Sequence, residues 1–284
     1  MPKILTLTDG SVYAPSVYDH AAWAAKRMGA SVEVLHVLDH HREKAAVTDF
    51  SGNIGVDARD ELLTQLAELD AAKSKVAMTQ ARVVLDHARA HLTEAGVTDL
   101  TLSQRHGPLV ETLEEVEASA DLVVIGKRGE AADFATGHLG ANLERVIRGS
   151  TKPVLVANRA FKPINRLLIA YDGGTSARKA VSHVATRPLL QGIECHLLMV
   201  GAATAANQEK LALAREELAA GGLESRATLI EGEPESRVGE YVKSEGIDLL
   251  VVGAYGHSRI RHLIIGSTTT TLIRTCQVPL LMFR

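Results

Sequence analysis

Short apolar runs alternate with longer stretches of helical periodicity along this chain. Four of the runs are apolar throughout, as is typical of strands buried on both faces of a sheet: LVVIG, PVLVA, LLVVG and PLLMF. Strands that alternate with helices predict an α/β protein with a parallel sheet between two layers of helices. The expected strands lie near 3–8, 32–38, 98–104, 121–126, 153–157, 166–171, 193–199, 225–230, 248–253 and 278–283.

The pattern occurs twice, because the second half of the chain repeats the first. Residues 3–38 correspond to 166–200, and residues 121–156 correspond to 248–281, in order and in residue type. An internal repeat of this length determines the architecture more strongly than any single motif. We therefore expect two tandem, doubly wound, parallel five-stranded sheets with helices on both faces, in a Rossmann-like α/β fold.

The repeats place the predicted domains at 1–158 and 163–284, joined by the short linker NRAFKPIN at 158–165. Both lengths are ordinary for single domains. Because the linker is short, we expect the two domains to pack together as an intramolecular pseudo-dimer. A further homodimer of the whole chain is also expected, and a protein partner of unknown identity.

The first repeat carries about 36 extra residues after its second strand, within 39–95. Most of 57–95 has helical periodicity, and Gly96 ends it. Its leucines fit an amphipathic helix that covers the sheet: Leu62, Leu63, Leu66 and Leu69. A partner helix in a coiled coil is the alternative interpretation, and core packing is the one we favour.

Composition narrows the class of protein. The net charge of −3 gives no basic footprint for nucleic acid. No apolar run approaches the roughly 18 residues of a membrane span, and the chain enters its first strand without a leader, so we expect a cytoplasmic protein without membrane contact. The two cysteines, Cys195 and Cys276, suit buried thiols better than a disulfide.

Candidate binding chemistry follows the fourth strand of the second repeat, where the pattern is G-x2-G-x9-G-S. Glycines allow a close backbone approach to a ligand, and a Ser-Thr pair at a helix start attracts anions. Basic residues add positive charge, and no acid interrupts the segment 253–268. Phosphate is the anion that fits best. The residues are Gly253, Gly256, His257, Ser258, Arg259, Gly266, Ser267 and Thr268.

Asp172 follows the first strand of the same repeat, and Asp9 is its counterpart in the first repeat. Since ligands of open α/β sheets bind at the carboxyl ends of strands, Asp172 can accept hydrogen bonds from a ribose near the glycine motif. A helix N-cap is the structural alternative for this side chain.

These motifs resemble the universal stress protein family, in its tandem two-domain form. The resemblance covers essentially the whole chain, through TDGS and YDGG after the first strands, the glycine motif, and the final strands STKPVLV and CQVPLLM. It implies that ATP, or a related adenine nucleotide with or without Mg²⁺, binds the second repeat. Asp172 and the backbone of Val200 would hold adenosine, and the glycine motif would hold the phosphates.

The first repeat departs from the pattern. Its segment runs from Gly126 and Gly129 to Gly140, one residue longer, and Ala141 replaces the serine. Glu130 and Asp133 would repel phosphate at short range. We therefore expect a weak, altered or empty first site, in a domain that serves mainly for packing and interaction.

The function we predict is a nucleotide-dependent sensor or interaction module in a stress response. A slow ATPase is an alternative, although the motif offers no paired carboxylates or activated nucleophile. A P-loop is absent, as is a G-x-G-x-x-G dinucleotide motif. An ATP pyrophosphatase and a nucleotide-free scaffold stay open as interpretations. So does a zinc-binding stress protein that uses Asp39, His40 and His41 or the pair His87 and His91.

Overall fold

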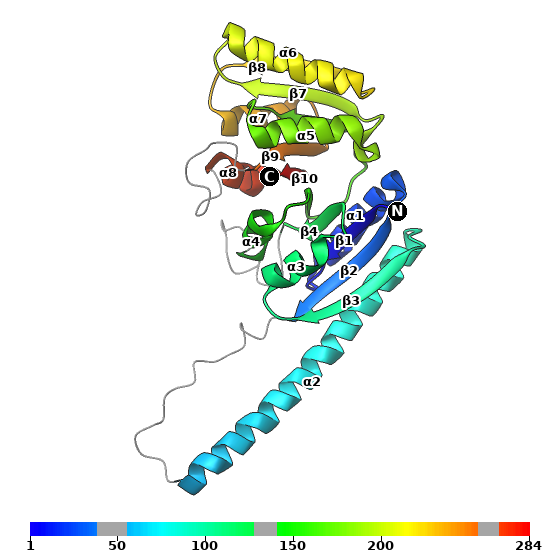
Figure 1. Ribbon diagram of the computed structural model, residues 1–284, viewed down its shortest axis with the longest axis vertical. Helices are drawn as coiled ribbons and strands as arrows, with labels where there is room; N and C mark the ends of the chain where they lie inside the picture. The colour runs from blue at the N-terminus through cyan, green and yellow to red at the C-terminus, as the bar shows by residue number, and fades with distance from the viewer. Residues whose placement is uncertain (39–55, 128–140, 255–266) are drawn as a thin grey trace.

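The computed structural model describes residues 1–38, 56–127, 141–254 and 267–284 (Figure 1). The N-terminal repeat contains the strands β1 (Lys3–Leu7), β2 (Ser31–Leu38), β3 (Leu100–His106), β4 (Leu122–Gly126) and β5 (Val154–Ala157). Its helices are α1 (Ala14–Met28), α2 (Val56–Glu94), α3 (Leu109–Glu117) and α4 (Ala141–Gly149).

The C-terminal repeat follows the same order of elements. Its strands are β6 (Arg166–Ala170), β7 (Glu194–Val200), β8 (Ser225–Ile230), β9 (Leu249–Gly253) and β10 (Leu280–Phe283). Its helices are α5 (Thr175–Thr186), α6 (Ala205–Ala220), α7 (Pro234–Ser244) and α8 (Ser267–Thr275), with a short 3₁₀ turn, η3 (Pro188–Leu190). Every strand expected from the apolar runs is present, so the predicted α/β class is confirmed.

The strands form one sheet in the order β3-β2-β1-β4-β5-β10-β9-β6-β7-β8. Within each repeat all pairs are parallel, as in a doubly wound fold. The two five-stranded sheets meet at their last strands, where β5 and β10 pair antiparallel with Leu281 opposite Leu155. Hydrophobic periodicity alone predicted two sheets, and this edge pairing makes them continuous.

Each face of the sheet carries one core that runs through both repeats. Ile4 points to the face covered by α1, α5, α6 and the last turns of α2, while Leu5 points to the face of α3, α4, α7 and α8. Arg27 on α1 adds a contact between the repeats, because its guanidinium donates to the carbonyls of Leu189 and Gln191. The repeats therefore share both cores as well as one sheet.

Helix α2 corrects one prediction. Its last turns pack on α1, β2 and β3 through Ala81, Leu85, Ala88 and Leu92. Leu63, Leu66 and Leu69 are instead 54%, 43% and 50% exposed, and Leu62 is half-buried. Figure 1 shows why, since the first half of α2 projects away from the sheet. The leucine pattern is real, but the sheet ends before the helix does, so the expected core packing is wrong there.

Two other predictions concern single features of the chain. Cys195 and Cys276 are both buried free thiols, and burial raises the pKa of Cys195 to about 12. Among the described residues, none of the helices combines the length and the apolar character that crossing a bilayer requires.

Candidate functional site

The topology of the C-terminal repeat brings three predicted site residues to one edge of the sheet. Strand β6 lies between β7 and β9, with Ala170 paired to Leu198 on one side and to Val252 on the other. The strand order reverses here, and doubly wound folds bind ligands in the crevice at such a switch point. Asp172, Val200 and Gly253 lie at the carboxyl ends of these three adjacent strands.

The turn after β6 holds Asp172 at the mouth of this crevice. Gly173 has a φ of 74°, a left-handed conformation that favours glycine. The backbone N–H of Gly174 donates to Asp172 Oδ1 at 2.7 Å, and the side chain is exposed. The N-cap residue of α5 is Gly174, so Asp172 shapes the turn before the helix instead of capping it.

Gly253 leaves no room for a side chain. A Cβ at this position would lie 2.6 Å from the backbone nitrogen of Ala177 and 2.7 Å from Ser176 Oγ. The first turn of α5 therefore packs directly on the end of β9, so this glycine has a structural role whatever it binds. Ser176 Oγ is buried at this contact, and none of the described residues hydrogen-bonds to it.

Lys210 on α6 is a neighbour that sequence reasoning missed. Its Cδ atom lies 2.9 Å from the place where a Cβ on Gly173 would be, so the lysine stem crosses the Asp172 turn. No motif marks this residue in the sequence, where it stands on the exposed face of a helix that packs on the sheet through Leu211, Ala214 and Leu218. Only the fold brings its positive charge to the end of β6.

The rest of the predicted glycine motif is described only in part. Gly256, His257, Ser258, Arg259 and Gly266 lie outside the described residues. Ser267 and Thr268 are the first two residues of α8, in agreement with the predicted helix start after the last glycine. A helix N-terminus at this position is a place where backbone N–H groups attract an anion.

The corresponding turn of the N-terminal repeat has the same backbone and different surroundings. The N–H of Ser11 donates to Asp9 Oδ1 at 3.0 Å, and Gly10 has a φ of 73°. Here, however, the residue against the glycine is Val84 of α2, whose Cγ2 methyl occupies the place that a Cβ on Gly10 would need. An apolar branched side chain thus takes the place that Lys210 takes in the second repeat.

Polar contacts connect β1, α1 and α2 in the same repeat. Thr8 Oγ1 and the Tyr18 hydroxyl lie 2.7 Å apart, and burial raises the pKa of Tyr18. His91 Nε2 on α2 lies 2.7 Å from Asp19 Oδ1, and the rings of His87 and His91 lie 6.1 and 5.6 Å from that of Tyr18. The two histidines that α2 brings to α1 are therefore in contact with Tyr18 and, for His91, with Asp19.

Two further predictions concern the first repeat. Within the described part of the chain, no cluster of three or more His, Cys, Asp or Glu residues is placed to hold a metal. Asp39, His40 and His41 lie outside that part, as do Gly129, Glu130, Asp133 and Gly140. Lys127, from the altered motif, donates to the carbonyl of Cys276 and so contacts the other repeat.

Comparison with known proteins shows the class to which this fold and strand-end arrangement belong. The model of the universal stress protein family matches twice, over residues 1–158 and 163–284. The chain belongs to this family, and the resemblance in its motifs is confirmed.

Particular relatives agree with this assignment. The chain is 40% identical to universal stress protein Slr1230 of Synechocystis sp. over 287 residues, which cover 100% of both chains. Its fold is similar to that of a universal stress protein from Archaeoglobus fulgidus, with a TM-score of 0.72, 21% identity, and coverage of 99% of this chain and 98% of the other. A shorter match, over 43% of this chain and 98% of the other at 21% identity and a TM-score of 0.38, is a universal stress protein in complex with cAMP.

Proposed function

We propose that the C-terminal repeat binds ATP or a related adenine nucleotide, and that the protein is a nucleotide-dependent sensor or interaction module of a stress response in the cytoplasm. The observation that carries the proposal is the meeting of Asp172 and Gly253 on adjacent strand ends at the switch point, directly before the motif G-x2-G-x9-G-S. We take the two segments 1–158 and 163–284 as its domains.

Each group at this edge has chemistry that suits part of a nucleotide. The exposed carboxylate of Asp172 can accept hydrogen bonds from ribose hydroxyls, and the backbone of Val200 lines the neighbouring strand end. The N-terminus of α8 attracts phosphate, and the Lys210 ammonium adds a charge that is mobile enough to follow it. Mg²⁺ would partly neutralise the phosphates.

The N-terminal repeat is proposed to bind nucleotide weakly or not at all. Val84 contacts the glycine of its turn, and Lys127 is committed to the contact with Cys276. The altered motif of this repeat lacks the serine that the second repeat has at Ser267. One nucleotide per chain is therefore the expected stoichiometry.

Isothermal titration calorimetry with ATP and Mg²⁺ tests this proposal through a matched pair of variants. Asp172→Ala should weaken ATP binding at least tenfold, because the ribose loses its acceptor, which is worth about 1.4 kcal/mol or more. Asp9→Ala removes the same side chain from the same turn of the first repeat and should leave binding unchanged. Titration with cAMP in parallel shows whether the phosphate chain contributes to affinity.

Three results would contradict the proposal. Two equivalent sites per chain would show that the first repeat binds as well as the second. A loss of binding in Asp9→Ala but not in Asp172→Ala would move the site to the first repeat. Absence of binding for both nucleotides, in protein from which any co-purified nucleotide has been removed, would leave an interaction scaffold.

A further inference from the structure

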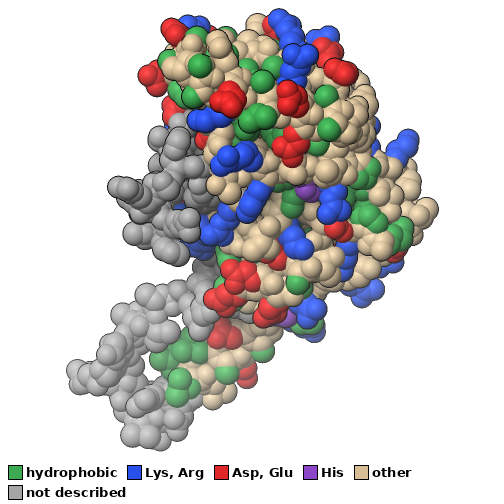
Figure 2. All heavy atoms as spheres, turned by 45° about the horizontal axis from the view of Figure 1, so that its top comes forward, with side chains coloured by type: hydrophobic (Ala, Val, Ile, Leu, Met, Phe, Trp, Pro, Cys, Tyr) green, Lys and Arg blue, Asp and Glu red, His purple; other side chains and the backbone are tan. Residues whose placement is uncertain are grey.

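Helix α2 exposes more apolar surface than its packing against the described residues of its own chain explains. Beyond Leu63, Leu66 and Leu69, the same helix exposes Val76 and Met78 by 58% and 54%. Figure 2 shows hydrophobic side chains gathered on the projecting part of the molecule, in its lower half. Contiguous exposed apolar patches of this kind mark interaction surfaces.

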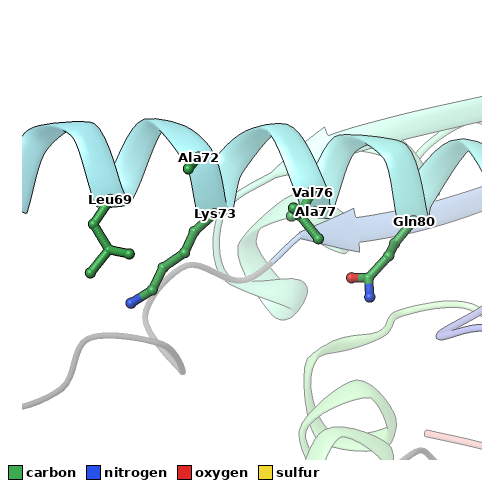
Figure 3. A pocket seen from close by; sticks show the side chains of 6 residues that line it. All are labelled: Leu69, Ala72, Lys73, Val76, Ala77 and Gln80. Atoms are coloured by element: carbon green, nitrogen blue, oxygen red, sulfur yellow. The ribbon is translucent and has the colours of Figure 1, made fainter.

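Part of this surface forms a continuous stripe on one side of the helix. Leu62, Leu66, Leu69, Lys73, Val76 and Gln80 follow one another at spacings of three and four residues, which places them on one face. Figure 3 shows Leu69, Lys73 and Gln80 extending to the same side of α2, where they line a shallow hollow of about 500 Å³ with Ala72, Val76 and Ala77. We call the six residues from Leu62 to Gln80 at this spacing the α2 stripe.

Charges along the same part of α2 are segregated by sign. Between residues 61 and 71 every charged residue is acidic: Glu61, Glu68 and Asp70. Between residues 72 and 85 every charged residue is basic: Lys73, Lys75 and Arg82. All six side chains are exposed. A second copy of this helix laid parallel would set acid against acid. Laid antiparallel, it would set each acidic half against a basic half.

We propose that the α2 stripe binds the α2 stripe of a second copy of this chain in an antiparallel helix pair. A register centred on residue 71 places Leu66 opposite Val76 of the second copy and Leu69 opposite Lys73, whose stem can cover apolar surface while its ammonium reaches Asp70 or Glu68. The charge pattern of this part of α2 is thus self-complementary, as a two-fold interface requires.

The lengths of the elements permit this arrangement. The paired part, 61–82, spans about 33 Å at 1.5 Å per residue, or three heptads. Contacts with the body of the protein begin near Ala81, ten residues from the centre, so the two bodies would lie at opposite ends of the helix pair. The last strands of the two repeats, β5 and β10, could otherwise have paired with a second copy of the chain. They pair with each other inside the chain instead.

Sedimentation velocity of the full-length chain over a range of concentrations tests the proposal. Val76→Glu should weaken the dimer at least tenfold, since it puts a carboxylate in the stripe opposite Leu66 of the second copy. Met78→Glu is the matched control, because Met78 is equally exposed two residues away but lies on the other side of the helix. It should leave the dimer unchanged. Both side chains are exposed, so circular dichroism should show folded protein in each case.

A charge-swap experiment tests the electrostatic part. The variant Lys73→Glu, Lys75→Glu, Arg82→Glu and the variant Glu61→Lys, Glu68→Lys, Asp70→Lys should each dimerise at least tenfold more weakly than the natural chain. An equimolar mixture should form a heterodimer, because one helix is then entirely acidic and the other entirely basic along the stripe.

Cysteine cross-linking reports the orientation. Single variants Leu66→Cys and Val76→Cys should form a disulfide when mixed and little when oxidised alone, because Cys195 and Cys276 are buried and the antiparallel register sets 66 against 76. Cross-linking of each variant with itself would mean a parallel pair and would overturn the proposal. So would a monomer up to about 100 µM, a dimer unaffected by Val76→Glu, or a stripe that binds only another protein.

Discussion

The turns after β1 and β6 share a backbone conformation and differ in the side chain that packs against their glycine, which comes from α2 in one repeat and from α6 in the other. Both have an aspartate that accepts an N–H from two residues on and a glycine with φ near 70°. In the N-terminal repeat, Val84 of α2 touches the glycine, and in the C-terminal repeat the stem of Lys210 crosses it. The turn of the N-terminal repeat is thus covered by an apolar side chain, and the turn of the C-terminal repeat is bordered by a flexible lysine.

This difference shows how two repeats of one fold can diverge without a change in their strands. The aspartate and glycine shape the turn by themselves, so they are kept whether or not a ligand binds. At these two turns, the difference comes from α2 and α6, elements that the aspartate–glycine motif does not include. A motif comparison limited to the turns would therefore treat Asp9 and Asp172 as equals.

Substitution of each turn glycine by alanine is expected to separate the two turns most strongly. Gly10→Ala should cost about 3 kcal/mol of unfolding free energy, because a left-handed φ costs about 1–2 kcal/mol and Val84 leaves no room. Gly173→Ala should cost only about 1 kcal/mol, since the flexible Lys210 stem can move aside. Urea denaturation measures both. Equal losses would mean that the two turns are equally confined.

Both repeats contain a histidine that is buried or half-buried, and acid is expected to lower the stability of the fold through it. His20 and His183 occupy equivalent positions, and each ring lies 5.0 Å from a phenylalanine ring, Phe161 and Phe283. Burial lowers the pKa of both histidines, that of His183 to about 4. The unfolded chain then binds protons that the folded chain does not, so stability is full above about pH 6.5 and falls as the pH drops toward 4.

The expected loss from His183 over that range is about 1–2 kcal/mol, after allowance for its partial exposure. Thermal melts of the natural chain and His183→Leu between pH 7 and 4.5 measure it. The variant should lose less stability on acidification than the natural chain. Parallel pH profiles for the two proteins would show that His183 is not buried as a neutral ring.

The smallest expected effect comes from substitution of Lys210, the residue that borders the turn of the C-terminal repeat. Lys210→Val should weaken ATP binding about five- to tenfold, roughly 1 kcal/mol. The ATP affinity of this variant should also change less with salt concentration, because one positive charge is lost. Lys210→Arg keeps the charge and should stay within about twofold of the natural affinity. Because Lys210 is exposed, neither change should alter the melting temperature by more than a degree or two. Unchanged affinity in Lys210→Val would mean that the ammonium does not face the nucleotide.

The sequence predicts the strands well because their cause is local. LVVIG, LLVVG and their counterparts must be buried on both faces, and an apolar run records that directly. The meeting of Asp172, Val200 and Gly253 also follows from the sequence, since strand order within a doubly wound repeat brings their ends together.

What could not be predicted depends on contacts between distant segments. The leucines of α2 have the periodicity of a buried face, but whether a sheet lies beneath them depends on where the sheet ends. The pairing of β5 with β10 uses backbone groups and leaves no pattern in the side chains. Lys210 reaches its turn only because α6 packs beside β7 and β8, so its position depends on the tertiary fold.

The covalent connection across the β5–β10 pair has a consequence for stoichiometry. Residues 158–165 tether the two edges, so each meets the other at an effective concentration in the millimolar range for a short linker. Dilution in the cell therefore does not separate them, and an edge of another molecule must compete with this effective concentration. Every molecule therefore carries one intact and one altered motif in a fixed one-to-one ratio, whatever the expression level.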